Sequence, residues 1–113
     1  MQQQFNCTEL FLFAVKLGIP TSVELQKLGI EIAGKWRKLG RRLGLIEAEI
    51  SGINHAHDEL SEKGYAMLEL WTQSKGSAAT YQALCDALQD DLVQRLDLAE
   101  RFCYIKGNYF FTI

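Results

Sequence analysis

Residues 36–45 read WRKLGRRLGL, and this stretch decides the fold class that the sequence predicts. Successive residues of an α-helix are about 100° apart, which puts Trp36, Leu39 and Leu43 on one side of a helix. Gly44 follows at a position where helices commonly end. The stretch therefore predicts a helix with one buried side and one solvated side, on which these basic residues gather: Lys35, Arg37, Lys38, Arg41 and Arg42.

A capping box predicts the start of an earlier helix. The sequence TSVE begins at Thr21, whose hydroxyl is able to accept the amide hydrogen of Glu24 while the Glu24 carboxylate accepts that of Thr21. The helix that follows turns Leu25, Leu28 and Ile32 to one side. Both helices therefore have an apolar side to bury.

Helical periodicity continues through the rest of the chain, without the sustained alternation that is typical of strands. Further helices are expected at about 47–56, at about 60–74, after an N-cap at Ser77, and within 91–104. The last of them is predicted to turn the following residues inward: Leu92, Leu96, Ala99 and Phe102 or Cys103.

Short connections between these helices imply that neighbours pack against each other, so the predicted fold is an all-α, six-helix antiparallel bundle. The bundle is expected to span residues 21–105. An N-terminal extension, 1–20, is predicted to hold a short helix at 8–17, and a tail, 106–113, contains a strand-like aromatic run. Residues at inward helical positions form the predicted core: Trp36, Leu39, Leu43, Ile50, Ile53, Leu68, Trp71, Leu84 and Leu88.

Charge is distributed unevenly along the chain. The net charge is only −2, whereas nucleic-acid-binding domains are usually strongly basic. Residues 29–44 are basic, and residues 45–62 and 77–105 are acidic. A molecule that carries patches of both signs is suited to association with other proteins as well as to anion binding.

The residue types of common enzyme and metal sites do not gather in the sequence. His55 and His57 are two residues apart, and on a helix such side chains point in nearly opposite directions and cannot share a metal ion. Cys85 occupies a core position, where a thiol is inert. The sequence therefore predicts no catalytic, cofactor or metal site.

Three cysteines without a C-x-x-C spacing indicate a reducing compartment. The apolar run at 10–15 is too short to span a membrane, and the residues before it lack the positive charge of a signal peptide. We therefore expect a cytoplasmic protein without membrane insertion.

Four segments in order resemble the death domain. WRKLGRRLGL at 36–45 and the EAEI segment that begins at Glu47 are similar to the second and third helices of that family. Trp71 lies where the family has a tryptophan in its fourth helix. GSAATYQALCDAL at 76–88 and RLDLAERF at 95–102 are similar to the fifth and sixth helices.

The resemblance covers about 21–104 and departs from the family pattern in two places. Ile46 stands where the family often has a serine or threonine helix cap, so the helix after it is expected to begin less cleanly. The connection at 88–97 is longer than in many members of the family.

The resemblance implies a death fold and a function without chemistry of its own. Such a domain is an adaptor or recruitment module in apoptotic or innate-immune signalling, which associates homotypically with other death-domain proteins and is able to build helical oligomers. One half of a contact is then the basic set named above. The expected acidic counterpart consists of Glu47, Glu49, Asp90 and Asp91.

Two other functions stay open for the same residues. A helical nucleic-acid-binding domain would use the same arginines, although the acidic segments would repel a duplex. A purely structural domain of a larger protein would not self-associate at all.

Overall fold

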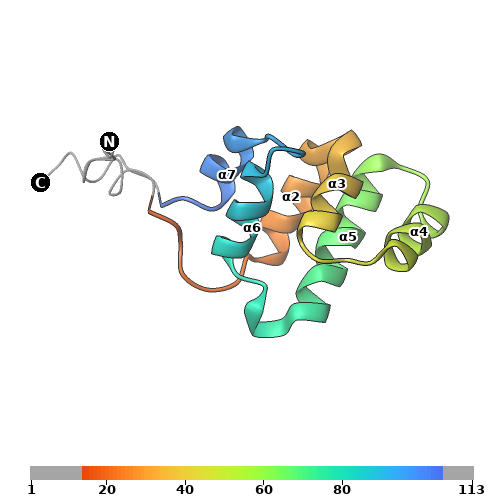
Figure 1. Ribbon diagram of the computed structural model, residues 1–113, viewed down its shortest axis with the longest axis horizontal. Coiled ribbons are helices and arrows are strands. Elements are labelled where there is room, and N and C mark those ends of the chain that lie inside the picture. Colours follow the sequence, from red (N-terminus) through yellow and green to blue (C-terminus); the bar gives the residue numbers. More distant parts are fainter. Residues whose placement is uncertain (1–13, 106–113) are drawn as a thin grey trace, which may run out of the picture.

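The computed structural model describes residues 14–105 and contains six α-helices within that range (Figure 1). The six-helix, all-α bundle predicted from the sequence is therefore confirmed. Short 3₁₀ turns at Ala33–Lys35 and Gly76–Ala78 precede two of the helices. The helices are α2 (Ser22–Ile32), α3 (Trp36–Arg42), α4 (Glu47–Ala56), α5 (Leu60–Lys75), α6 (Tyr81–Gln89) and α7 (Leu96–Phe102).

The core lies around α5, against which α2, α3 and α4 all pack. All nine side chains that the sequence assigns to the core are buried, and Met67 on α5 is buried with them. α2 and α5 come closest where Gly29 faces Gly64. A Cβ atom on Gly64 would lie 2.6 Å from the carbonyl oxygen of Gly29, so the two helices touch through their backbones.

The starts of α2 and α4 show how hydrogen bonds to the cap residues determine where a helix begins. The capping box at Thr21 is confirmed, because the Glu24 amide donates to the Thr21 hydroxyl (3.2 Å) and the Thr21 amide donates to the Glu24 carboxylate (2.9 Å). α4 begins after Ile46, which has no side-chain acceptor. Glu49 compensates in part, since its carboxylate accepts the Ile46 amide hydrogen at 3.0 Å.

The start of α6 differs from the prediction. Ser77 lies within the 3₁₀ turn that begins at Gly76, whose φ is +56°. The N-cap is instead Thr80, whose hydroxyl accepts the amide hydrogen of Ala83 at 3.1 Å. The predicted cap at Ser77 is therefore wrong, because the left-handed glycine and the 3₁₀ turn delay the helix.

The inward residues predicted for the last helix are partly wrong. Leu92 and Leu96 are 56% and 48% exposed, while Val93 and Leu98 are buried. The cause is a turn after α6, in which the Asp90 carbonyl accepts from the Val93 and Gln94 amides at 2.9 and 2.7 Å. Gln94 has a φ of +53°, so a continuous helical phase from residue 91 is impossible.

The N-terminal extension is not helical in its described part, residues 14–20. Val15 forms an antiparallel β-bridge with Tyr104, and the Lys16 amide donates to the Cys103 carbonyl at 2.8 Å. The helix predicted at 8–17 is therefore wrong over 14–17, and its remainder lies outside the described residues, as does the tail at 106–113. The boundaries of the bundle at 21 and 105 stay predictions.

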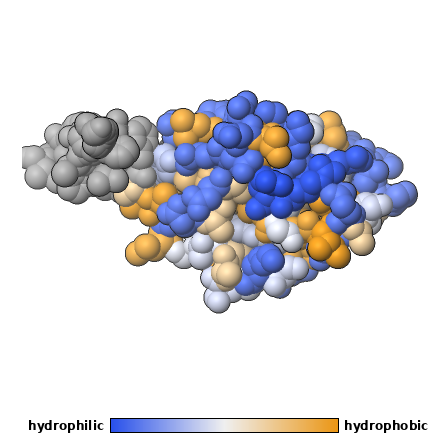
Figure 2. Space-filling model, in the orientation of Figure 1, coloured by the Kyte–Doolittle hydropathy of each residue, from blue (hydrophilic) through white to orange (hydrophobic). Residues whose placement is uncertain are grey.

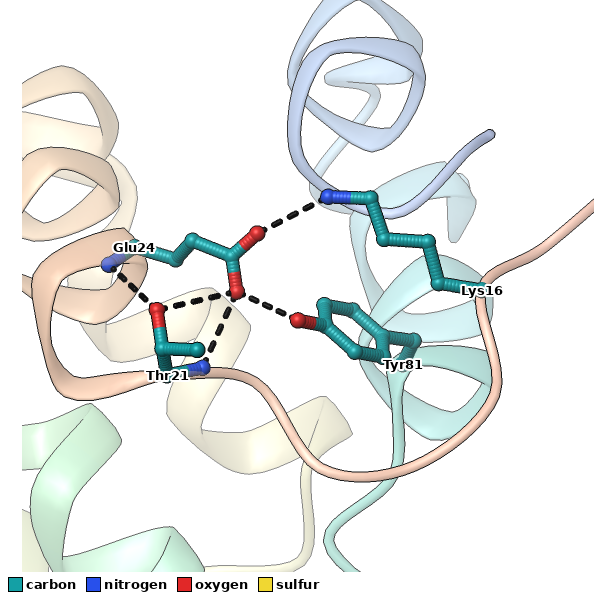
Figure 3. A network of polar contacts seen from close by, with 4 residues as sticks. All are labelled: Lys16, Thr21, Glu24 and Tyr81. Carbon is teal, nitrogen blue, oxygen red and sulfur yellow. Dashed lines mark hydrogen bonds and ion pairs between the residues drawn. The ribbon is translucent and has the colours of Figure 1, made fainter. Parts of the chain in front are cut away.

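A polar network joins this extension to the bundle (Figure 3). The Glu24 carboxylate accepts hydrogen bonds from the Lys16 ammonium (2.9 Å), the Tyr81 hydroxyl and the Thr21 amide. Partial burial acts to raise the pKa of Glu24, but these donors outweigh it and lower the pKa to about 2. Burial and the hydrogen bond to Glu24 raise the pKa of Tyr81 to about 12. The charged form of Glu24 therefore holds three segments together.

Substitution of Glu24 with glutamine is expected to remove part of the acid sensitivity of the fold. The native pKa of about 2 is below the ordinary value of 4.5, so Glu24 contributes stability above pH 4.5 that is lost as the pH falls towards 2. The shift corresponds to about 3 kcal/mol. Urea unfolding from pH 7 to pH 2 measures it: the wild type should lose that amount more than Glu24→Gln over this interval.

Tyr81→Phe is expected to have an intermediate effect on the acid sensitivity, because it removes one of the hydrogen-bond donors to Glu24 and keeps the carboxylate. Its loss of stability on acidification should lie between those of the wild type and Glu24→Gln. Parallel pH profiles for all three proteins would contradict the assignment.

Candidate interaction surface

α3 divides its residues between the core and the solvent. Arg37, Lys38, Arg41 and Arg42 are exposed, as the helical phase predicts. Lys35 differs from them, because it is only half-exposed and its ammonium donates to the Val93 carbonyl at 2.7 Å. That lysine contacts the connection between α6 and α7, so four basic side chains of this segment rather than five are exposed.

Two of the expected acidic residues lie beside the basic ones. The Arg41 guanidinium donates to the Glu47 carboxylate at 2.5 Å, across the α3–α4 connection. Arg42 and Asp90 approach to 3.9 Å between α3 and the end of α6. Residues that the sequence analysis treated as opposite halves of a contact therefore adjoin each other within one molecule.

The other two acidic residues have different surroundings. Glu49 is half-exposed and its carboxylate caps α4, as described above. Asp91 is exposed in the turn after α6. The structure therefore does not bring these two carboxylates into contact with the basic side of α3.

The Arg41–Glu47 pair is exposed to solvent. The hydrogen bond between them raises the pKa of the Arg41 guanidinium and lowers the pKa of the Glu47 carboxyl. Exposed pairs of this kind contribute little to folding, because water solvates the separated ions almost as well. Their charges are therefore available for other partners at small cost.

An open groove of about 510 Å³ lies between α3 and α6. A band of strongly hydrophilic residues covers this part of the surface in Figure 2. The groove includes three residues that the sequence analysis missed, although their helical spacing of three and four is visible in the sequence. Its lining consists of Arg41, Arg42, Ala83, Asp86, Ala87 and Asp90.

The histidines and the cysteine that were considered as metal-binding or catalytic residues do not line this groove. The His55 ring contacts the Ser51 carbonyl at 2.8 Å, and His57 lies 4.0 Å from Glu62. Cys85 is buried, and burial raises the pKa of its thiol. Within residues 14–105, no three side chains of the metal-binding types gather at one place.

The described part of the chain also contains no helix that is both long enough and apolar enough to cross a membrane.

Comparison with known proteins identifies the family. Residues 23–104 match the family model of the death domain. The chain is also similar to receptor-interacting serine/threonine-protein kinase 1 of Homo sapiens, with 31% identity over 91 residues. That match covers 78% of this chain but only 13% of the kinase, so the chain spans a small part of the length of this relative. Death domains are protein-interaction modules, and the extent of the family match together with the six-helix bundle shows that this chain belongs to the death domain family.

Proposed function

We propose that the chain is a cytoplasmic adaptor or recruitment module that binds other death domains in apoptotic or innate-immune signalling. The observation that carries the proposal is the solvated basic side of α3, formed by Arg37, Lys38, Arg41 and Arg42. The similarity of the chain to receptor-interacting serine/threonine-protein kinase 1 supports a role in signalling. The cytoplasmic location rests on the free thiols of Cys85 and Cys103.

The physical argument for association depends on several charge pairs acting together. One exposed pair contributes about 0.2–1 kcal/mol, which cannot offset the entropy lost when two small domains associate. Several pairs between complementary surfaces add up, steer the encounter and disfavour surfaces of like charge. Activity in such a module follows from the local concentration of the proteins that it brings together.

Recognition of a protein is favoured over recognition of nucleic acid by the carboxylates around the arginines. Glu47 pairs with Arg41, and Asp86 and Asp90 line the same groove as Arg41 and Arg42. A phosphate backbone that approached these arginines would meet the three carboxylates as well. A protein surface with charges of both signs avoids that repulsion.

Charge reversal of the two arginines tests the proposal. We expect the mass of the wild-type protein in light scattering to rise with concentration. Arg41→Glu/Arg42→Glu should associate at least about tenfold more weakly, because each attraction between an arginine and a carboxylate of the partner molecule becomes a repulsion. Circular dichroism should show equal helicity for both proteins.

Lys27→Glu/Lys75→Glu is the matched control, because it makes the same change in net charge at exposed positions of α2 and α5. It should associate as the wild type does. Monomeric wild type at every concentration would contradict homotypic self-association. Tight binding of a labelled DNA duplex at physiological salt, lost in Arg41→Glu/Arg42→Glu, would favour the nucleic-acid function instead.

A further inference from the structure

The groove between α3 and α6 carries equal numbers of opposite charges. Arg41 and Arg42 come from the last turn of α3, whereas Asp86 comes from α6 and Asp90 directly follows its last residue. The two signs occupy separate walls, because each helix contributes only one of them. The groove is therefore neutral as a whole but polarised across its width.

The α6 wall of the groove carries short side chains. Ala83, Asp86, Ala87 and Asp90 recur at spacings of three and four, so they form one stripe along α6. Alanine at two of these positions places only methyl groups beside the carboxylates. A long side chain such as arginine is able to lie along this wall, with its methylene groups on the alanines and its guanidinium at an aspartate.

The ion pairs within the molecule hold these charges only loosely. Arg42 and Asp90 are 3.9 Å apart, at the limit of an ion pair, and their side chains are 40% and 33% exposed. The Arg41–Glu47 pair is shorter, but its side chains are 41% and 70% exposed. Exchange of such exposed partners for equivalent ones on another molecule costs little.

We propose that this groove binds the same groove of a second copy of the chain about a two-fold axis, which makes a closed dimer. Arg42 of each copy then meets Asp90 of the other, and Arg41 of each meets Asp86 of the other. A two-fold contact is formed by the same surface on both partners, so it requires charges of both signs on one surface. The proposal rests on the proposed homotypic function and specifies one contact that carries it.

A second copy fits this groove better than a partner of one charge sign. A purely acidic surface would be attracted by the α3 wall and repelled by the α6 wall, and a basic surface would show the reverse. A second copy that is rotated by 180° presents an aspartate to every arginine and an arginine to every aspartate. The groove is thus complementary to itself.

A complementation experiment tests the two-fold contact. Arg42→Asp places aspartate against Asp90 at both ends of the dimer, and Asp90→Arg places arginine against Arg42 at both ends. Each variant alone should sediment as a 12.8 kDa monomer at concentrations where the wild type has twice that mass. An equimolar mixture of the two variants should recover the dimer, because both contacts are then between opposite charges.

Three further variants keep the outcome clear. The Asp90 carboxylate also accepts the Leu92 amide hydrogen at 2.9 Å, so Asp86→Arg serves as a second acidic variant if Asp90→Arg fails to fold. It should be monomeric alone and should dimerise when mixed with Arg41→Asp. Lys27→Asp changes an exposed residue of α2 that does not line the groove, and it should dimerise as the wild type does.

The results separate this inference from the proposed function. Wild-type species that grow beyond the dimer, or a dimer that persists in both Asp86→Arg and Asp90→Arg, would overturn the two-fold contact and leave homotypic association intact. A mixture that stays monomeric while the wild type dimerises would overturn it as well. Wild type that is monomeric at every concentration would overturn the two-fold contact and homotypic self-association together, and would leave only binding to a different death-domain protein.

Discussion

Gly64→Ala is expected to destabilise the domain by about 3 kcal/mol, at the upper end of what overpacking of a core costs. The new Cβ atom would lie 2.6 Å from the Gly29 carbonyl oxygen and 3.1 Å from the Gly29 Cα. Both of these atoms belong to the backbone of α2. A backbone inside a helix cannot rotate away as a side chain does, so α2 and α5 must move apart along the centre of the core.

The reciprocal change gives the same expectation. A Cβ atom on Gly29 would lie 2.7 Å from the Tyr65 amide nitrogen, which belongs to the backbone of α5. Gly29→Ala should therefore destabilise to a similar degree. The double variant should cost less than the sum of the two single variants, because the first alanine already separates the helices.

Gly52→Ala is the control for both variants. Gly52 lies inside α4, and apart from its chain neighbours and the backbone of its own helix no described atom is within 4 Å of the position that its Cβ would take. Alanine is favoured over glycine in a helix interior by about 0.8–1.0 kcal/mol, so this substitution should stabilise the domain. Urea unfolding monitored by circular dichroism measures all three changes. Equal stability of Gly64→Ala and Gly52→Ala would contradict the close crossing of α2 and α5.

The elements predicted correctly from the sequence are those whose signals are local. Trp36, Leu39 and Leu43 are buried at the phase that a helix requires. The cap at Thr21 uses a residue only three positions away. The bounds of α4 also agree with the predicted 47–56. In each case, side chains within one or two helical turns determine the structure.

The failures concern contacts between segments that are distant in the sequence. Val15 pairs with Tyr104 almost at the other end of the described chain, which no local pattern indicates. In the sequence, Gly29 and Gly64 are only glycines in the interior of two helices. Their role in the close contact between α2 and α5 becomes visible only in the structure. Gln94 has a positive φ although it is not a glycine, so the sequence contains no signal for this turn. The phase of the last helix could therefore not be predicted.

The candidate interaction surface also combines a local feature that the sequence predicted with contacts between distant segments that it did not predict. Helical phase predicted which side of α3 is basic. The neighbours of its arginines depend on the packing of α3 against α6, so the pairing of Arg42 with Asp90 and the part played by Asp86 could not be read from the sequence. The sequence therefore predicted two charged patches, and the structure places part of each in one groove.

Trp36→Ala is expected to cost about 3–5 kcal/mol, the usual cost of truncating a large aromatic residue in a core. Trp36 is the first residue of α3 and only 2% exposed, and it packs within the main core cluster. Domains are typically stable by about 5–15 kcal/mol, so the loss would leave the fold marginal or unfolded. Urea unfolding at neutral pH measures the loss where the variant still folds, and circular dichroism detects complete unfolding.

Arg37→Ala is the nearest control, because the Arg37 guanidinium lies over the Trp36 ring, 5.5 Å from the ring centroid. Loss of this exposed cation–π contact should cost no more than about 1 kcal/mol. Arg42→Asp, on the same helix, should change stability by about 0.5 kcal/mol or less while it abolishes association. If Trp36→Ala were as stable as these two variants, residues 36–45 would not divide between the scaffold and the interaction surface. The expected order makes that division measurable, since the buried side of α3 is expected to determine whether the domain folds and the basic side is proposed to determine what it binds.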